Sequence, residues 1–526
     1  MGPPARRSGG AQAHGRRWAA PAGAGVRAAQ GPGGRPRGRR AQPPGSSQRA
    51  DPARRAACDV LCAVAERGTY ANLMLPALLA ERGITGRDAA LATELAYGTL
   101  RGQGTYDAIL TACLDRDLAA IDIPVREVLR LGAHQLLATR IQPHAAVATS
   151  VDLARYAAGH RPAGFVNAVL RRVASADLEG WLGIVAPGRA EDLSGHLAIR
   201  YSHPRWIVTA LQQALGETAA GAMTETEAAL AADGIPPAAT LCAVPGLADQ
   251  AELIAAGAGP ARWSPYGVYL KAGDPANIAA VAHRRAWVQD EASQLAALAL
   301  ARVQVSGGDA RWLDMCAGPG GKARLLAGLA AARAARVLAA DLRFHRALLA
   351  RNALSAGPGG GAGGGAGSGG AGSGGADRVS VAVADGTVPA WRSAAFDRVL
   401  ADVPCSGLGA LRRRPDARWR RSPADVAQLA GLQRRLLARA VDSARAGGVV
   451  AYVTCSPHLA ETRDVVAAVL AGRGDAELLD APAVLSEVPD LRCPAPYARY
   501  AQFWPHRHGT DAIFLALLRR TGGRGR

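Results

Sequence analysis

Residues 311–341 read RWLDMCAGPGGKARLLAGLAAARAARVLAAD, and this stretch decides the fold class. Its first residues, RWLDMC, form a short apolar run, and a glycine-rich loop follows. The loop leads into a helical segment rich in alanine and leucine, and a second apolar run, RVLAAD, ends at Asp341. A strand, a loop, a helix and a second strand in this order predict one βαβ unit of a parallel sheet.

Further short apolar runs extend this pattern towards the C-terminus: RVSVAVAD, FDRVLADV, GGVVAYVTC and AIFLALL. We therefore expect an α/β domain with a Rossmann-like, doubly wound sheet over residues 286–520. In such sheets ligands bind outside the carboxyl ends of the strands. The polar residues at or just past the predicted strand ends are Asp314, Cys316, Asp341, Asp385, Asp402, Cys405 and Cys455.

The N-terminal part of the chain follows a different pattern. In residues 51–175, segments such as ACDVLCAVAERG and VREVLRLGAHQLLATR repeat apolar residues with the period of amphipathic helices, which predicts an all-α domain. Residues 176–285 combine a helix in RWIVTALQQAL with a strand in ATLCAVPG, and we expect a connecting subdomain there. The Gly-, Pro- and Arg-rich residues 1–50 and the Gly/Ser tract 357–375 are predicted to be disordered.

Composition narrows the class of function. The 526-residue chain has a net charge of +19, and the part after residue 50 still carries +9, which favours a polyanionic partner, nucleic acid first. No uncharged apolar run reaches the length of a membrane span, so we expect no membrane partner. Eight cysteines without a CxxC pair favour reduced thiols and a cytoplasmic location.

The first chemical signal is the loop Cys316, Ala317, Gly318, Pro319, Gly320, Gly321 and Lys322. Glycines let the backbone approach a ligand, and a helix start offers free N–H groups to a carboxylate or phosphate. The loop is no Walker A motif, because a cysteine replaces its first glycine and Ala323 its hydroxyl residue. Asp341 suits the ribose hydroxyls of a nucleoside cofactor or a helix cap, and Asp385 suits an adenine edge or a plain turn.

The second signal is a pair of cysteine motifs, Asp402–Ser406 (DVPCS) and Thr454–Pro457 (TCSP), after neighbouring predicted strands. A single cysteine is most often a small buried hydrophobe, but two at strand tips suggest reactive thiols. Methylation of cytosine needs such a thiol, because thiolate addition at carbon 6 makes carbon 5 nucleophilic. Asp402 is placed to hydrogen-bond the ring nitrogen and stabilise the charge of that adduct.

Together, CAGPGGK, DVPCSGLG and VTCSPHLAET resemble the motifs of the bacterial Sun/Fmu-type (RsmB-like) ribosomal RNA cytosine-5 methyltransferases. The segments ATELAYGTLRG, LRLGAHQLL and AGFVNAVLRR resemble the NusB-like RNA-binding domain of that family. The resemblance extends from Arg54 to Arg520. It implies a seven-stranded methyltransferase domain after the helical one, S-adenosylmethionine as cofactor, and small-subunit (16S) ribosomal RNA as substrate. We expect no metal, and we assume a monomer because the sequence does not indicate the oligomeric state.

The resemblance also implies residue roles. Cys455 is expected to be the nucleophile and Cys405 to assist product release. Residues Cys316 to Lys322, with Asp341, Asp385 and Asp402, are expected to bind the cofactor. The sequence departs from the usual family pattern at Gly318, Ala323 and Val403, and Ala323 lacks a hydroxyl that could lie near the cofactor.

Two other functions stay open at this point. The chain could be a non-catalytic NusB-like RNA-binding or antitermination factor, although both motif cysteines are retained. It could also be a DNA cytosine-5 methyltransferase, in which the Pro-Cys motif, and so Cys405, would supply the nucleophile.

The basic run and a pair of histidines near the C-terminus each have a structural and a functional interpretation. The basic run Arg412–Arg421 is either a solvated face or, beside Cys405, a surface for RNA phosphates. His506 and His508 could be metal ligands with Cys493, but the absence of a second ligand pair at zinc spacing favours a role in the RNA groove or in packing.

Overall fold

The computed structural model describes residues 50–218, 223–271, 273–355 and 378–522. Apart from Ala50, the basic tail predicted to be disordered lies outside the described residues, as does the whole Gly/Ser tract 357–375.

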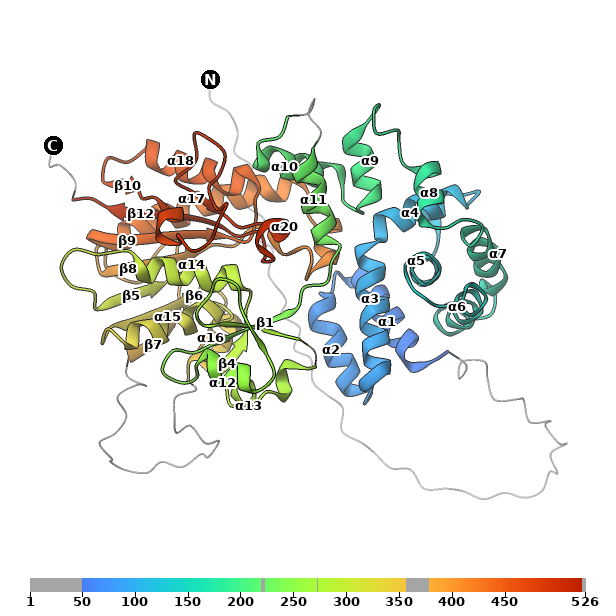
Figure 1. Ribbon diagram of the computed structural model, residues 1–526, viewed down its shortest axis with the longest axis horizontal. Helices are drawn as coiled ribbons and strands as arrows, with labels where there is room; N and C mark the ends of the chain where they lie inside the picture. The colour runs from blue at the N-terminus through green and yellow to red at the C-terminus, as the bar shows by residue number, and fades with distance from the viewer. Residues whose placement is uncertain (1–49, 219–222, 272, 356–377, 523–526) are drawn as a thin grey trace, which may run out of the picture. The chain divides into compact units, whose positions relative to one another are not determined.

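The segment that decides the fold class forms the expected βαβ unit (Figure 1). Strand β5 (Arg311–Asp314) leads through the glycine loop into α15 (Gly321–Ala331), and β6 (Arg336–Asp341) pairs with β5 in parallel. The other strands of this sheet are β7 (Val379–Val383), β8 (Phe396–Asp402), β9 (Ala444–Thr454), β10 (Ala476–Leu478), β11 (Ala501–Gln502) and β12 (Phe514–Arg520).

The sheet has the order β10-β12-β9-β8-β5-β6-β7, and β11 pairs with the first two residues of β12. The described residues therefore form eight strands in this sheet, one more than the seven expected. Strands β5 to β9 run parallel, and β12 runs antiparallel to β9. The very short strands β10 and β11 are the ones that the sequence pattern missed, because two or three residues are too few to show an alternation.

Helices cover both faces of the sheet, so the domain has three layers (Figure 1). Along β5, Trp312 packs into the core beneath α14 (Glu291–Arg302) and α15, while its neighbour Leu313 packs into the core beneath α17 (Pro423–Ser443) and α18 (Arg463–Ala471). Residues alternate in the same way along β8 and β9. Burial on both faces explains why these strands are continuous apolar runs in the sequence.

The strand order places a topological switch point between β5 and β8. From β5 the chain proceeds outwards through β6 and β7, then returns to β8 and proceeds to β9 on the other side. In doubly wound sheets the loops on the two sides of a switch point diverge, and ligands bind in the crevice between them, outside the carboxyl ends of the strands. Both the glycine loop and the first cysteine motif emerge at this crevice.

The N-terminal part is helical, as predicted. Asp51 caps the first helix by accepting a hydrogen bond from the Arg54 N–H, and Gly68 ends it in the left-handed conformation. The α-helices here are α1 (Pro52–Arg67), α2 (Ala71–Glu81), α3 (Gly86–Arg101), α4 (Gln103–Ala112), α5 (Ile123–Ala138), α6 (Pro143–Ala158) and α7 (Ala163–Val173). Their apolar faces share one hydrophobic core.

The connecting region contains both predicted elements, a helix and a strand, within a larger set. Its helices are α8 (Leu178–Val185), α9 (Leu193–Arg200), α10 (Arg205–Leu215), α11 (Thr224–Asp233), α12 (Gln250–Ala255) and α13 (Ala279–Ala282). A separate four-stranded sheet has the order β2-β3-β1-β4, with β1 (Ala239–Ala243), β2 (Gly259–Pro260), β3 (Gly267–Leu270) and β4 (Ala286–Val288). Because β4 belongs to this sheet, the small sheet extends past residue 285.

All the residues that the structure describes belong to one compact unit. Within the described residues, no helix is both long enough and apolar enough to cross a lipid bilayer.

Candidate functional site

The glycine loop is shaped by its first two glycines. A Cβ on Gly318 would lie 2.5 Å from the Asp341 Oδ2, and a Cβ on Gly320 would lie 3.0 Å from the Ala350 Cα. Gly320 also has a φ of +110°, which side chains disfavour. The turn into α15 therefore needs glycine at position 320, whereas a side chain at position 318 would have to displace Asp341 and Arg346.

Asp341 lies at the end of β6 and is buried against this loop. Its Oδ2 accepts a hydrogen bond of 3.1 Å from the Gly318 N–H, and its Oδ1 accepts one of 2.9 Å from the Arg343 N–H. Arg346 of α16 (Phe344–Leu354) forms an ion pair of 3.5 Å with the same carboxylate. These backbone hydrogen bonds leave Asp341 able to bind a ligand as well, because each carboxylate oxygen can accept more than one hydrogen bond.

Asp385 is exposed at the end of β7, and its carboxylate accepts hydrogen bonds from the N–H and the hydroxyl of Thr387. These bonds lower the pKa of Asp385. The turn nevertheless lies beside the glycine loop, because a Cβ on Gly386 would be 2.9 Å from the Met315 Cγ. Asp385 thus stays a candidate for the outer end of the crevice.

Three buried polar atoms around the loop have no protein hydrogen-bond partner. They are the Asp314 Oδ2, the Trp287 Nε1 and the Gln289 Oε1. A Cβ on Gly321 would lie 3.5 Å from the Trp287 Nε1, so these groups border the loop directly. Burial, and next the nearby Asp402 carboxylate, raise the pKa of Asp314 to about 8. Such unpaired groups are expected where a polar ligand completes the hydrogen bonding.

This set fits S-adenosylmethionine. Helix N–H groups and glycine backbone suit a carboxylate, Asp314 suits a cation, and Asp341 suits vicinal hydroxyls. Ala323 does not disturb this fit, because its side chain is fully buried in a small cluster with Ala317 and Ala339.

Lys322 links the glycine loop to the first cysteine motif. Its Nζ donates a hydrogen bond of 2.8 Å to the Asp402 Oδ2. Burial opposes the charged form of Lys322, but the Asp402 carboxylate outweighs it, so the pKa of Lys322 is raised. Lys322 is therefore a cation at the base of the crevice, between the loop and the cysteines.

The two cysteine loops are in direct contact. The Gly409 N–H donates to the Cys455 carbonyl at 3.0 Å, and the Val403 N–H donates to the Val453 carbonyl at 3.1 Å. A Cβ on Gly409 would lie 2.0 Å from the Ala512 carbonyl oxygen, so only glycine allows this approach. Cys405 and Cys455 are each partly exposed, not sealed in the core.

The two thiols differ in their electrostatic surroundings. Burial, then Glu461 and Asp402, raise the pKa of Cys405 to about 12, although the N–H groups of Gly407 and Cys455 oppose this. Burial, then Asp511, also raise the pKa of Cys455, but here two cations, Arg413 and Lys322, favour the thiolate. Both thiols therefore hold their protons in this structure, and Cys455 differs from Cys405 in having Arg413 and Lys322 beside it.

Sequence reasoning missed two residues beside Cys455. The Cys455 Sγ lies 4.0 Å from the Oδ2 of Asp511, and Arg413 binds the same carboxylate oxygen. Arg412 spans from Asp511 at 3.2 Å to Asp290 at 3.1 Å. Burial, then Asp290, raise the pKa of Asp511 to about 6. The signal in the sequence was the position of HGTD just before the predicted strand at AIFLALL.

Both interpretations of the basic run are wrong for two of its arginines. Arg412 is 8% exposed and Arg418 is fully buried, so neither faces solvent or can contact RNA phosphates. Arg418 donates from Nη1 to the carbonyls of Arg101 and Ser202, and from Nη2 to that of Asp233. Arg418 therefore joins the α/β part to the helical part and the connecting region, and backbone carbonyls satisfy its charge.

The two histidines have protein partners. His508 is buried, with its Nδ1 accepting from the Trp504 N–H and its Nε2 bonded to the Pro489 carbonyl. His506 bonds the Glu225 carboxylate at 2.9 Å. In the part of the chain that the structure describes, no group of three His, Cys, Asp or Glu residues could hold a metal. These contacts with other protein groups favour a packing role for His506 and His508.

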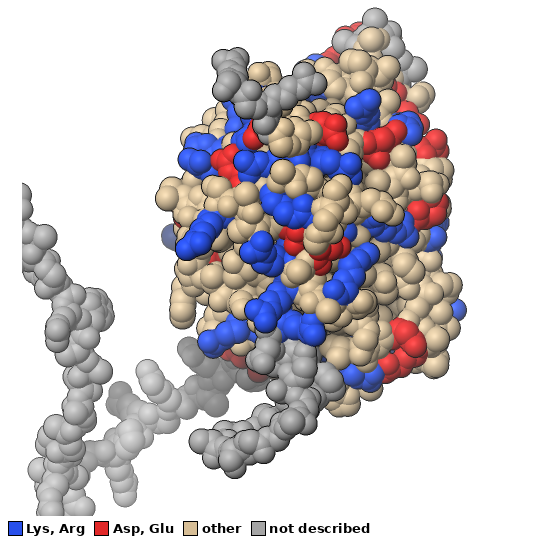
Figure 2. All heavy atoms as spheres, turned by 90° about the vertical axis from the view of Figure 1, so that its left-hand side faces the viewer, with Lys and Arg blue, Asp and Glu red and all other residues tan. Residues whose placement is uncertain are grey.

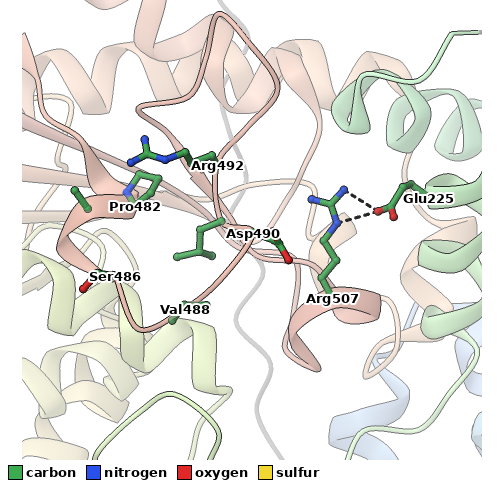
Figure 3. A pocket seen from close by; sticks show the side chains of 9 residues that line it. Glu225, Pro482, Ser486, Val488, Asp490, Arg492 and Arg507 are labelled. Carbon is green, nitrogen blue, oxygen red and sulfur yellow. Dashed lines mark hydrogen bonds and ion pairs between the residues drawn. The ribbon is translucent and has the colours of Figure 1, made fainter.

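A cavity of about 720 Å³ opens elsewhere, beside the loop that follows α19 (Ala481–Val484). Figure 3 shows Glu225 and Arg507 facing each other, joined by their ion pair, while Arg492 points away on the other side. No residue of the glycine loop or of the cysteine motifs lines this cavity. We assign no step of the reaction to it.

A doubly wound sheet with a glycine loop after β5, and with an acidic residue after the next strand, suits a nucleoside cofactor. A methyltransferase family model also matches the chain, so its class is that of the S-adenosylmethionine-dependent methyltransferases. The crystal structure of PH0851 has the same fold, with a TM-score of 0.69 and 18% identity over 89% of this chain and 99% of that one.

Comparison with known proteins gives the family. The family model described as 16S rRNA methyltransferase RsmB/F matches residues 374–519, and the NusB family model matches residues 51–175. Rv1407 of Mycobacterium tuberculosis (strain ATCC 25618 / H37Rv) is 49% identical over 89% of this chain and 97% of that protein. Ribosomal RNA small subunit methyltransferase B of Sodalis glossinidius (strain morsitans) is 32% identical over 86% and 94%. The chain belongs to the RsmB/F methyltransferase family, which confirms the resemblance drawn from its motifs.

Proposed function

We propose that this protein transfers the methyl group of S-adenosylmethionine to carbon 5 of a cytosine in small-subunit (16S) ribosomal RNA, through a covalent adduct with Cys455. The observation that carries the proposal is the contact between the two cysteine loops after the neighbouring strands β8 and β9, next to the switch point, where the Gly409 N–H donates to the Cys455 carbonyl at 3.0 Å. Packing alone does not require two cysteines at this place. A covalent mechanism does use two thiols, one to form the adduct with the base and one to assist its release.

Cys455 acts as the nucleophile. Burial raises the pKa of the free thiol, and Arg413 and Lys322 oppose this by stabilising negative charge on the sulfur. The thiolate, once formed, adds to carbon 6 of a cytosine extruded into the crevice. Asp402, at the end of β8, hydrogen-bonds the ring nitrogen, and Lys322 holds the Asp402 carboxylate in place. When bound, S-adenosylmethionine supplies the electrophilic methyl group.

Cys405 acts after methyl transfer. The hydrogen on carbon 5 must pass as a proton to a base, and the electron pair of that C–H bond restores the double bond between carbons 5 and 6. The bond between carbon 6 and the Sγ of Cys455 breaks in the same elimination, with its electron pair returning to sulfur. Cys405 is a partly exposed residue on the neighbouring loop, and its thiol, protonated because its pKa is raised, can pass that proton to the leaving sulfur of Cys455. Residues Cys316 to Lys322, Asp341 and Asp385 hold the cofactor.

RNA is favoured as the substrate on three grounds. The N-terminal part belongs with the NusB family, and relatives over nearly the whole chain are named for ribosomal RNA of the small subunit. Basic side chains are also spread over one face of the molecule, in patches broken by acidic ones (Figure 2). This surface suits the counterion release that dominates binding to phosphate backbones. The chain acts as a monomer in the cytoplasm under this proposal.

Matched substrates test the proposal. Purified protein with methyl-labelled S-adenosylmethionine should label small-subunit RNA and leave DNA of the same sequence unlabelled. Bisulfite sequencing of the product RNA should then locate 5-methylcytosine at a defined position. Labelled DNA would favour the DNA methyltransferase, and RNA binding without label would favour the non-catalytic NusB-like factor.

A further inference from the structure

Glu461 lies behind both cysteine loops, in the 3-10 turn η7 (Leu459–Glu461) that follows β9. Its side chain is fully buried. One carboxylate oxygen, Oε1, accepts from the Ser406 N–H at 2.7 Å and from the Gln433 Nε2 at 3.1 Å. The other, Oε2, accepts from the hydroxyls of Ser406 and Ser456.

Three of these four donors belong to the residues that follow the two motif cysteines. Ser406 follows Cys405 and Ser456 follows Cys455, so one carboxylate joins both loops immediately next to the reactive thiols. Gln433 extends the network, because its Nε2 also donates to the Pro404 carbonyl at 2.8 Å. The Cys405 segment is thereby tied on both sides of the cysteine.

We propose that Glu461 is a positioning residue that sets the relative placement of the two thiols. This inference rests on the proposed two-cysteine reaction and adds a residue to which that reaction assigns no role. Glu461 touches neither substrate nor cofactor and acts through Ser406 and Ser456.

Stability alone does not account for this carboxylate. Its four donors are neutral groups, and a buried charge without a cation gains less than a well-packed apolar side chain would. A fully hydrogen-bonded carboxylate instead fixes the positions of the groups that donate to it, because all four of its acceptor directions are used. Its charge also contributes to the raised pKa of Cys405.

The substitution Glu461→Gln tests the inference, since it keeps the shape but replaces one acceptor oxygen with an NH₂ donor. Two of the four donors then face another donor. We expect kcat for RNA methylation to fall about 10- to 100-fold, the range that a small misplacement of reacting groups produces. The KM values for RNA and for S-adenosylmethionine should stay within about twofold of the wild type. A larger fraction of the enzyme should be trapped as an RNA adduct.

Glu477→Gln is the matched control, because it makes the same chemical change on the exposed side of β10. It should leave kcat and adduct level unchanged. If Glu461→Gln does not fold, Ser406→Ala and Ser456→Ala each remove one donor and should lower kcat in the same direction, with raised adduct.

An unchanged kcat in Glu461→Gln would overturn the inference. So would a parallel loss of cofactor binding, RNA binding and Tm, which is the pattern of a purely structural residue. If wild-type protein itself forms neither 5-methylcytosine nor adduct, the proposed function fails instead, so the two failures are distinguishable.

Discussion

The Nζ of Lys322 lies 2.8 Å from the Oδ2 of Asp402, which connects the glycine loop after β5 to the cysteine motif after β8. The lysine side chain is 11% exposed and the aspartate 29%, so this ion pair is only partly screened by water. Through this ion pair, the charge on the cofactor side of the crevice directly affects the charge on the cytosine side. Lys322 was predicted as a cofactor ligand, and its contacts extend that expectation towards the thiols.

Lys322→Met should lower kcat about 100-fold, the usual cost of removing one group that stabilises developing charge in a closed site. Cofactor affinity, measured by calorimetry, should fall much less. Lys271→Met is the matched control, because Lys271 is exposed and is the only other lysine in the chain. A variant that loses cofactor affinity but keeps kcat at saturation would restrict Lys322 to binding.

Asp314→Asn should alter how stability depends on pH. The folded-state pKa of about 8 lies above the usual value, so the folded protein keeps a proton that the unfolded chain loses. Stability from this group is therefore present at low pH and is lost as pH rises from about 4 to about 8. Each pKa unit corresponds to about 1.4 kcal/mol, which thermal unfolding can resolve.

Thermal unfolding of the cofactor-free protein between pH 5 and pH 8 checks this. The Tm advantage of Asp314→Asn over the wild type should grow as pH rises. Asp385→Asn serves as the control, since the lowered pKa of that exposed carboxylate places its titration below this window. Parallel curves for Asp314→Asn and wild type would contradict the assignment.

Arg418→Met should destabilise the protein by about 3 kcal/mol, because it leaves the buried carbonyls of Arg101, Ser202 and Asp233 without their donor. Arg414→Met, at an exposed position of the same run, should change stability by less than about 0.5 kcal/mol. Urea unfolding followed by circular dichroism measures both. Equal stability of the two variants, with weaker RNA binding by Arg418→Met, would return Arg418 to the RNA surface.

Much of the fold could be predicted because local patterns were strong. The parallel strands are buried on both faces, so β5, β6, β8 and β9 stand out as apolar runs, and the helices of residues 51–175 show one clear period. Strands β10 and β11 are too short to carry any pattern. The small sheet was only partly predicted, since its strands come from separate places along residues 239–288.

Site residues that directly follow a strand could be predicted from the sequence. Site residues that come from segments distant in the sequence could not. The motif cysteines and Asp402 are fixed by the strand ends that precede them. Arg413 and Asp511 reach Cys455 only through tertiary folding, and their separation in sequence gives no sign of contact. Arg418 was misjudged for the same reason: burial of an arginine depends on carbonyls supplied by distant segments.

The most direct test of the account uses the two cysteines. Denaturing gel electrophoresis after incubation with labelled RNA and S-adenosylmethionine separates free protein from covalent adduct, with Cys62→Ala as a control remote from the crevice. The account predicts that Cys455→Ala gives neither methylation nor adduct, and that Cys405→Ala accumulates a stable RNA–protein adduct. An adduct trapped by Cys455→Ala, or full methylation by that variant, would contradict it.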